Sequence, residues 1–67
     1  MIPVDSTNLE SVGYENNTLY VLFHSGGLYS YDGVPYSLYQ SLMSAPSKGK
    51  FLSQYIKNSY PYKKLNR

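Results

Sequence analysis

Four consecutive residues in the second half of the chain have side chains that suit an anion-binding turn: Ser47, Lys48, Gly49 and Lys50. They come directly before an apolar stripe of helical spacing, so they fall at the start of an expected helix. A helix N-terminus presents free backbone N–H groups and a partial positive charge, and both favour anions. Glycine allows a phosphate close to the backbone and is otherwise a poor helix residue. The segment predicts a phosphate site, with an ordinary serine cap and solvated lysines as the alternative.

Tyrosines supply the second candidate group, and nine of them in 67 residues is a high number. Tyr29 and Tyr31 are two residues apart, which places both rings on one face of an extended strand. Together with Tyr20 on the neighbouring strand they could stack nucleobases, as aromatic side chains do in sheet-based RNA-binding domains. The alternative is that most of these rings form the core under the helices.

The tail at residues 60–64 combines aromatic and basic side chains. Tyr62 could stack a base, and Lys63 and Lys64 could contact phosphate, because basic groups interleaved with aromatic rings suit both contacts. The alternative is a tail that its tyrosines pin to the domain, with its lysines in water.

Residues for catalysis or metal binding are scarce. The chain contains no cysteine and His24 is its single histidine, so disulfides, thiolate metal sites and histidine-rich zinc sites are excluded. The four acidic residues fall in expected turns or on strand edges, and no nucleophile elbow, P-loop or dinucleotide motif is present. We therefore expect a surface histidine, no catalytic residue, no metal, no cofactor and no enzyme activity.

Three strands must position the tyrosines. Asn16 and Asn17 fit a tight hairpin turn, because asparagine tolerates the left-handed backbone that such a turn needs. In the strand that follows, Leu19, Val21 and Phe23 share one face. The strands are expected at residues 9–14, 18–24 and 28–31, with a second turn at residues 25–27.

Two amphipathic helices follow the strands. Pro35 suits the first helical position, where its missing N–H is no loss, and Pro46 stops this helix. Ser47 can cap a second helix that ends near Asn58. We expect the tail to be extended around Pro61 and to dock on the sheet as an edge strand. The apolar stripes are Leu38, Tyr39, Leu42 and Met43 in the first helix and Phe51, Leu52, Tyr55 and Ile56 in the second.

These elements predict the fold class. We expect an α+β fold, a three- to four-stranded antiparallel β-sheet followed by two helices, in one two-layer domain over residues 1–67. The charges are split along the chain, since all four acidic residues lie in the first half and all six basic residues from position 48 onward. Such asymmetry indicates a basic surface for anionic partners, or alternatively a solvated surface with ion pairs across the domain.

Targeting signals are missing from the sequence. No stretch approaches the roughly 20 apolar residues that cross a membrane. The N-terminus has no basic segment and no apolar run of signal-peptide length. We expect a complete, cytoplasmic chain with no membrane contact.

Taken in order, the residues resemble the KTSC domain family over nearly the whole chain. The resemblance implies a cytosolic, non-catalytic domain, which occurs at the C-terminus of some lysyl-tRNA synthetases and as small stand-alone proteins of bacteria and phages; RNA binding is the usual suggestion for it. The chain has Phe51 where the family often has tyrosine, and Lys63 and Lys64 where it often has arginine. The matching residues are 4–6, 9, 12–14, 19–21, 23, 25–31, 34–35, 47–51 and 60–65.

Three functional hypotheses follow from these residues. The first is a non-catalytic binding module for a phosphate-bearing partner, either single-stranded RNA or a nucleotide. The second is a protein-interaction module, for example a phage factor that occupies a host protein or defence component in the host cytoplasm, because tyrosine is enriched in interface hot spots. The third is a homo-oligomer that sequesters a nucleotide signal, since a small core favours self-association.

Overall fold

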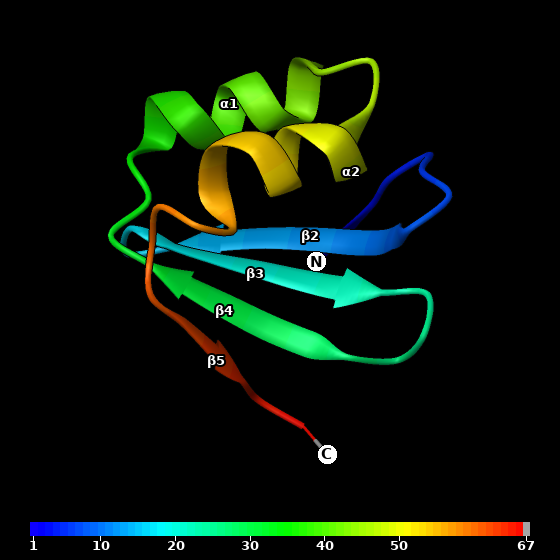
Figure 1. Ribbon diagram of the computed structural model, residues 1–67, viewed down its shortest axis with the longest axis horizontal. Coiled ribbons are helices and arrows are strands. Elements are labelled where there is room, and N and C mark those ends of the chain that lie inside the picture. Colours follow the sequence, from blue (N-terminus) through cyan, green and yellow to red (C-terminus); the bar gives the residue numbers. More distant parts are fainter. Residues whose placement is uncertain (67) are drawn as a thin grey trace.

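The sheet is an antiparallel meander. The computed structural model describes residues 1–66, and within this range the five strands follow one another in the order β1-β2-β3-β4-β5. The helical segments come between β4 and β5 and lie on one side of the sheet (Figure 1). The strands are β1 (Ile2–Pro3), β2 (Leu9–Glu15), β3 (Thr18–Phe23), β4 (Leu28–Asp32) and β5 (Tyr62–Lys64), and the helical segments are α1 (Tyr36–Ser44), α2 (Lys48–Phe51) and η1 (Leu52–Ile56).

Two short turns fix the register of the meander. Asn16 and Asn17 join β2 to β3 with φ angles of 52° and 63°, the left-handed conformation that was expected of them. Gly26 has a φ of 100° in the turn between β3 and β4, a conformation that few residues other than glycine adopt. The hairpins are therefore dictated locally by turn chemistry.

The alternation of side chains separates a covered face from an open face. Leu19 and Val21 share one face, as predicted, and they are fully buried on the side of the helices. Their cross-strand partners on β4 are Tyr31 and Tyr29, so these two rings share the covered face. The buried apolar core consists of Leu9, Val12, Leu19, Val21, Tyr31, Val34, Leu42, Leu52 and Ile56. It is one cluster between the sheet and the helices, which confirms the two-layer α+β prediction.

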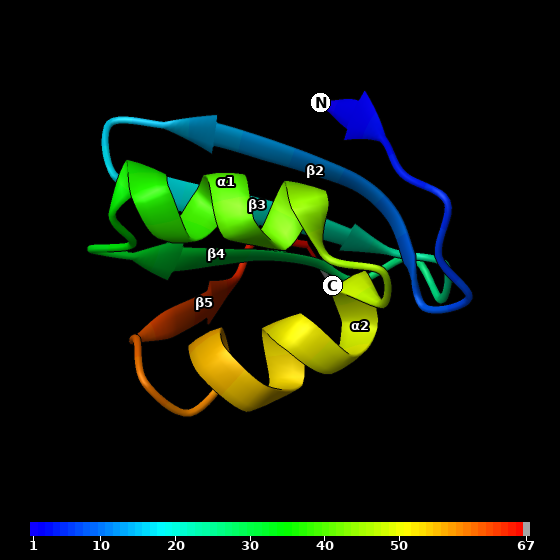
Figure 2. The same cartoon turned by 90° about the horizontal axis from the view of Figure 1, so that it is seen from above.

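The helices differ in detail from the expectation. Helix α1 begins at Tyr36, so Pro35 occupies the capping position one residue before the expected one. The second helix changes at Leu52 from α to π geometry, and the backbone N–H of Lys57 donates to the Leu52 carbonyl at 2.8 Å. From there the chain turns back directly into β5 (Figure 2). This return path places the end of the helix beside the edge of the sheet.

Of the two edge strands of the sheet, only the C-terminal one was predicted. The edge strand expected in the tail is β5, which pairs with β4. Strand β1 was not expected, because two residues are too few to show alternation. The sheet thus has five strands within residues 1–66 where three or four were expected. In this same range no helix is both long and apolar enough to cross a membrane.

One group of tyrosines has a structural role. The Tyr14 hydroxyl donates a hydrogen bond of 2.6 Å to the carbonyl of Val34, and the Tyr14 ring stacks on Tyr39 with centroids 4.7 Å apart. Tyr36 lies beside both rings. These contacts hold the start of α1 against β2, so Tyr14, Tyr36 and Tyr39 have a role in the fold.

Candidate functional site

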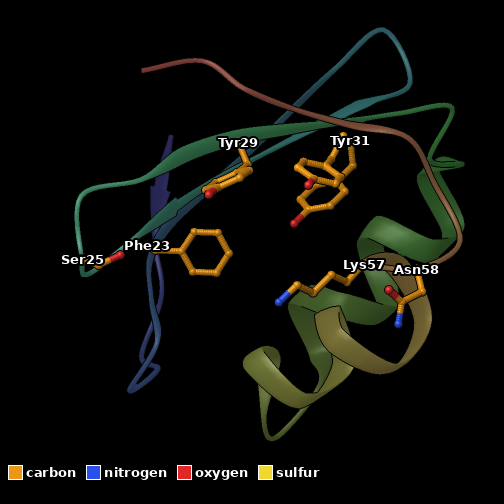
Figure 3. Close-up of a pocket in the computed structure, with 7 residues that line it drawn as sticks. Phe23, Ser25, Tyr29, Tyr31, Lys57 and Asn58 are labelled. Atoms are coloured by element: carbon orange, nitrogen blue, oxygen red, sulfur yellow. The ribbon is translucent and has the colours of Figure 1, made fainter. Parts of the chain in front are cut away.

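A second group of aromatic rings surrounds a hollow between β4, β5 and the end of η1. We call it the aromatic pocket. In Figure 3, Phe23, Tyr29 and Tyr31 project into the hollow from the sheet, and Lys57 extends toward it from the helical side. The cavity has a volume of about 430 Å³, and its lining residues are Phe23, Ser25, Tyr29, Tyr31, Lys57, Asn58 and Tyr62.

Strand register explains why these rings meet. Tyr31 pairs with Tyr62 across β4 and β5, so Tyr62 lies on the covered face with Tyr29 and Tyr31. The ring centroids of Tyr62 lie 5.9 Å from Tyr29 and 6.2 Å from Tyr31, and Phe23 meets Tyr29 edge-on at 5.5 Å. The three tyrosines predicted to stack bases are therefore neighbours in one site.

The exposure of the three tyrosine rings increases from the bottom of the aromatic pocket to its rim. Tyr31 is 2% exposed and belongs to the core, Tyr29 is half-buried, and Tyr62 is 63% exposed. The alternative that these rings form core thus holds for Tyr31 and not for Tyr62. A planar ligand would reach Tyr62 first.

The grouping of Tyr20 with these rings was wrong. Tyr20 pairs with Ser30 in the register of β3 and β4. Because side chains alternate, Tyr20 projects from the open face, opposite to Tyr29 and Tyr31. The two strands were predicted correctly, but the face of β3 from which Tyr20 projects was not.

Lys57 is a site residue that the sequence analysis missed. It follows the last turn of η1 and lines the aromatic pocket. The signal that could have found it is its spacing from Lys50 and Ser53, since residues at intervals of three or four share one side of a helix. Its ammonium group adds positive charge to a pocket whose other lining residues are neutral.

The segment of Ser47, Lys48, Gly49 and Lys50 lies apart from the aromatic pocket. It lines a hollow of about 380 Å³ together with Asp5. The ammonium group of Lys48 donates to the Ala45 carbonyl at 3.1 Å, and the carboxylate of Asp5 opposes an anion in this hollow. Ser47 holds the capping position without a side-chain cap hydrogen bond. Lys50 lines this hollow too, but it also lines a neighbouring hollow that has no acidic residue in its lining, so it is the lysine of this segment that is best placed for an anion.

Gly49 has a packing explanation. A Cβ atom at this position would lie 3.1 Å from the side-chain nitrogen of Asn8, which is closer than an ordinary contact. The absent side chain therefore allows α2 to approach the loop before β2. The approach of a phosphate is not needed to account for this glycine.

The two lysines of the tail lie on opposite faces of β5. Lys64 pairs with Tyr29 and shares its covered face, whereas Lys63 pairs with Ser30 and projects from the open face. Both are exposed. The structure brings Lys64 to the side of the aromatic pocket and separates Lys63 from it.

A central hollow lies between the aromatic pocket and the hollow that Lys50 lines. This hollow, of about 440 Å³, shares Phe23, Ser25 and Lys57 with the aromatic pocket. At its other end it shares lining residues with a hollow of about 380 Å³. The lining residues of that last hollow are Asn8, Gly49, Lys50, Ser53 and Gln54, of which Asn8, Gly49 and Ser53 are shared. We call these three adjacent hollows, which share lining residues, the groove.

His24 lies at the surface, as predicted. Its Nε2 lies 2.9 Å from the Ser6 carbonyl oxygen, and its Nδ1 lies 4.0 Å from a carboxylate oxygen of Glu10. Both ring nitrogens therefore face groups of the neighbouring loop and strand. In the part of the chain that the structure describes, no cluster of three or more His, Cys, Asp or Glu side chains could hold a metal ion.

Tyr31 makes stability sensitive to alkaline pH. Burial raises the pKa of its phenol above 10.0, and the neighbouring Tyr29 and Tyr62 add to the shift. Because the folded state holds this proton more tightly than the unfolded state, the contribution is complete below about pH 10 and is lost as the pH rises through the raised pKa.

The expected result is that Tyr31→Phe reduces this alkaline loss. Urea unfolding of both proteins at pH 8 and pH 10.5 should show a smaller fall in the free energy of unfolding for the variant, because phenylalanine has no phenol to ionise. An equal fall in the two proteins would contradict the assignment.

The chain is similar in sequence and in structure to known proteins. The family model of the KTSC domain matches residues 5–60. The crystal structure of a KTSC domain protein from Yersinia pestis superposes with a TM-score of 0.92 at 39% identity, over 96% of this chain and 93% of that chain. A protein of Stutzerimonas stutzeri is 40% identical over 84% of this chain and 82% of its own length.

Longer relatives contain the domain as a small part. Lysine–tRNA ligases of Nostoc sp. and Trichormus variabilis are each 31% identical to this chain over 98% of its residues. The chain spans 12% of the length of these ligases. The fold therefore occurs both as nearly the whole of a small protein and within a larger one.

Proposed function

This chain belongs to the KTSC domain family, and on that premise we propose that it is a non-catalytic binding module for a phosphate-bearing partner, RNA or a nucleotide. The observation that carries the proposal is the aromatic pocket, in which Tyr29, Tyr31 and Tyr62 surround a hollow with Lys57 beside them. A base enters against the exposed ring of Tyr62, and the lysine meets the phosphate.

The chemistry of the pocket suits a nucleotide in three respects. Stacking of a base on an aromatic side chain contributes about 1–3 kcal/mol and tolerates any base. The ammonium groups of Lys57 and Lys64 attract phosphate and repel cationic ligands. The hydroxyl of Ser25 and the amide of Asn58, both in the lining, offer hydrogen bonds to base edges.

The longer relatives favour RNA among phosphate-bearing partners. Their name, lysine–tRNA ligase, includes an RNA, and this domain matches one small part of them. In our proposal that part contributes RNA contacts and no chemistry, as does the present chain. His24 supports the non-catalytic role, since its two nitrogens face Ser6 and Glu10 at the surface.

Fluorescence anisotropy with a labelled single-stranded RNA tests the proposal. We expect binding at about 50 mM salt that weakens as salt increases, because phosphate contacts release counterions. A labelled neutral oligomer of the same length serves as control. Absence of binding at low salt, or an affinity that does not change with salt, would contradict the proposal.

A second candidate function, protein interaction, is favoured by a different observation. Large apolar side chains are exposed outside the aromatic pocket: Met1, Ile2, Tyr36, Tyr55 and Leu65. A phage-type factor that occupies a host defence protein belongs to this class, and so does a homo-oligomer that traps a nucleotide. Pull-down from a lysate before and after nuclease treatment separates the candidates, because a protein partner survives nuclease and an RNA-mediated one does not.

A further inference from the structure

We infer that the partner is a single-stranded oligonucleotide that lies along the groove, with one base in the aromatic pocket and its backbone running toward Lys50. This inference rests on the proposed function and decides between its two ligands, RNA and a mononucleotide. It also assigns Lys57 and Lys50 to two different phosphates of one strand.

The adjacency of the three hollows is the first support. The aromatic pocket and the central hollow share Lys57, and the central hollow and the last hollow share Gly49 and Ser53. A ligand confined to the aromatic pocket would leave two hollows of about 440 and 380 Å³ empty. A strand of several nucleotides occupies all three.

The spacing of the lysines is the second support. Lys50 and Lys57 both line the groove, and they are seven positions apart along the second helix. At the α-helical rise of about 1.5 Å per residue this would be about 10 Å along the axis, and the π geometry from Leu52 onward makes it shorter. A mononucleotide carries its phosphates in one cluster at a single end of the molecule. Successive phosphates of a strand have a nucleoside between them and can meet both.

Charge along the groove is the third support. Among residues 1–66, the linings of the three hollows contain two lysines and no acidic residue. Asp5 lines the next hollow, which shares Gly49 and Lys50 with the last one, and its carboxylate repels a phosphate there. Glu10 faces His24 and is not part of the lining. An anionic strand is therefore attracted from the aromatic pocket as far as Lys50 and no further.

Polar groups between the two lysines suit a nucleic-acid backbone. The groove there presents the amides of Asn8 and Gln54 and the hydroxyl of Ser53. Such side chains bind phosphate and sugar oxygens without reading sequence. A base can enter the aromatic pocket only if it is free of pairing, which requires a single strand.

Calorimetric titration of the whole protein with UMP and with uridine oligonucleotides of two, four and six residues tests the inference. We expect the affinity to rise about tenfold or more from UMP to the tetranucleotide, because the second contact is intramolecular, and to change little from four to six residues. If UMP binds as tightly as the tetranucleotide, the oligonucleotide inference is wrong and the proposed function stands. If no member of the series binds, the proposed function itself is wrong.

Two lysine variants locate the strand. For the tetranucleotide, the slope of log affinity against log salt should fall by about 0.7 in Lys50→Gln and again in Lys57→Gln, one phosphate for each. For UMP, only Lys57→Gln should weaken binding. Lys63→Gln, which removes the same charge from the open face, is the matched control and should leave the slope nearly unchanged. Equal effects of all three variants would mean that net charge, and no path along the groove, determines binding.

Discussion

Replacing Tyr62 with alanine is expected to weaken the binding of single-stranded RNA by about 1–3 kcal/mol, or roughly 5- to 150-fold in Kd. The side chain is 63% exposed at the rim of the aromatic pocket, so its free face is available to a base. Its ring also lies beside the rings of Tyr29 and Tyr31. Anisotropy titration of the variant and the parent protein at one salt concentration measures the effect.

Tyr55 provides the matched control for this substitution. It is 52% exposed, its ring packs on Phe51, and it is absent from the lining of the aromatic pocket. Tyr55→Ala should leave the Kd within about twofold of the parent value, and Tyr62→Phe should retain most of the affinity, because stacking needs the ring and no hydroxyl. Parent-like binding by Tyr62→Ala would remove the stacking role of the pocket.

Replacing Leu19 with alanine is expected to lower the free energy of unfolding by about 2–5 kcal/mol. Leu19 is fully buried on the central strand β3, where it faces the helices, and the smaller side chain would leave a cavity. A domain of this size has a total stability of about 3–10 kcal/mol, so the variant would be partly or wholly unfolded. Urea unfolding followed by circular dichroism gives the change directly.

Leu22 on the same strand is the control for the two-layer architecture. It projects from the open face and is only half-buried. Leu22→Ala should therefore cost about 1 kcal/mol or less, because little apolar surface leaves water there. Similar losses at both positions would show that the two faces of the sheet are covered alike, which contradicts the arrangement in Figure 1.

The parts of the fold that local chemistry determines could be predicted from the sequence. Asn16 and Asn17 specify a hairpin wherever they occur between two alternating segments, and Pro46 ends a helix by itself. Strand β1 and the π geometry from Leu52 onward depend on contacts with distant segments. A strand of two residues and a single π-helical segment are too short to produce a recognisable pattern in the sequence.

The candidate site was predictable only in part, for a related reason. The spacing of Tyr29 and Tyr31 puts both rings on one face whatever the neighbours are, and this was correct. Which residues of β3 and β5 join them depends on register: Tyr62 of the tail shares their face, whereas Tyr20, which was expected beside them, does not. Lys57 reaches the aromatic pocket because the chain turns back after η1, a feature of tertiary structure.

The basic residues of the predicted phosphate site are not equally available to an anion. Lys48 is held by the Ala45 carbonyl, and Gly49 is required by the approach of Asn8. Lys50 and Lys57 remain as the two cations that line the groove in the described part of the chain. The sequence predicted an anion site at the single turn of residues 47–50. We propose instead that the anionic partner is bound along the second helix, from Lys50 to Lys57.

The most direct test of the central claim is a titration of the nitrogen-15-labelled protein with a uridine tetranucleotide, followed by backbone amide chemical shifts. The account predicts that the largest changes occur at Phe23, Tyr29, Tyr31 and Lys57 and extend to Lys50, while Leu22 on the open face stays unchanged. Changes centred on the open face, or no change at saturating ligand, would contradict it.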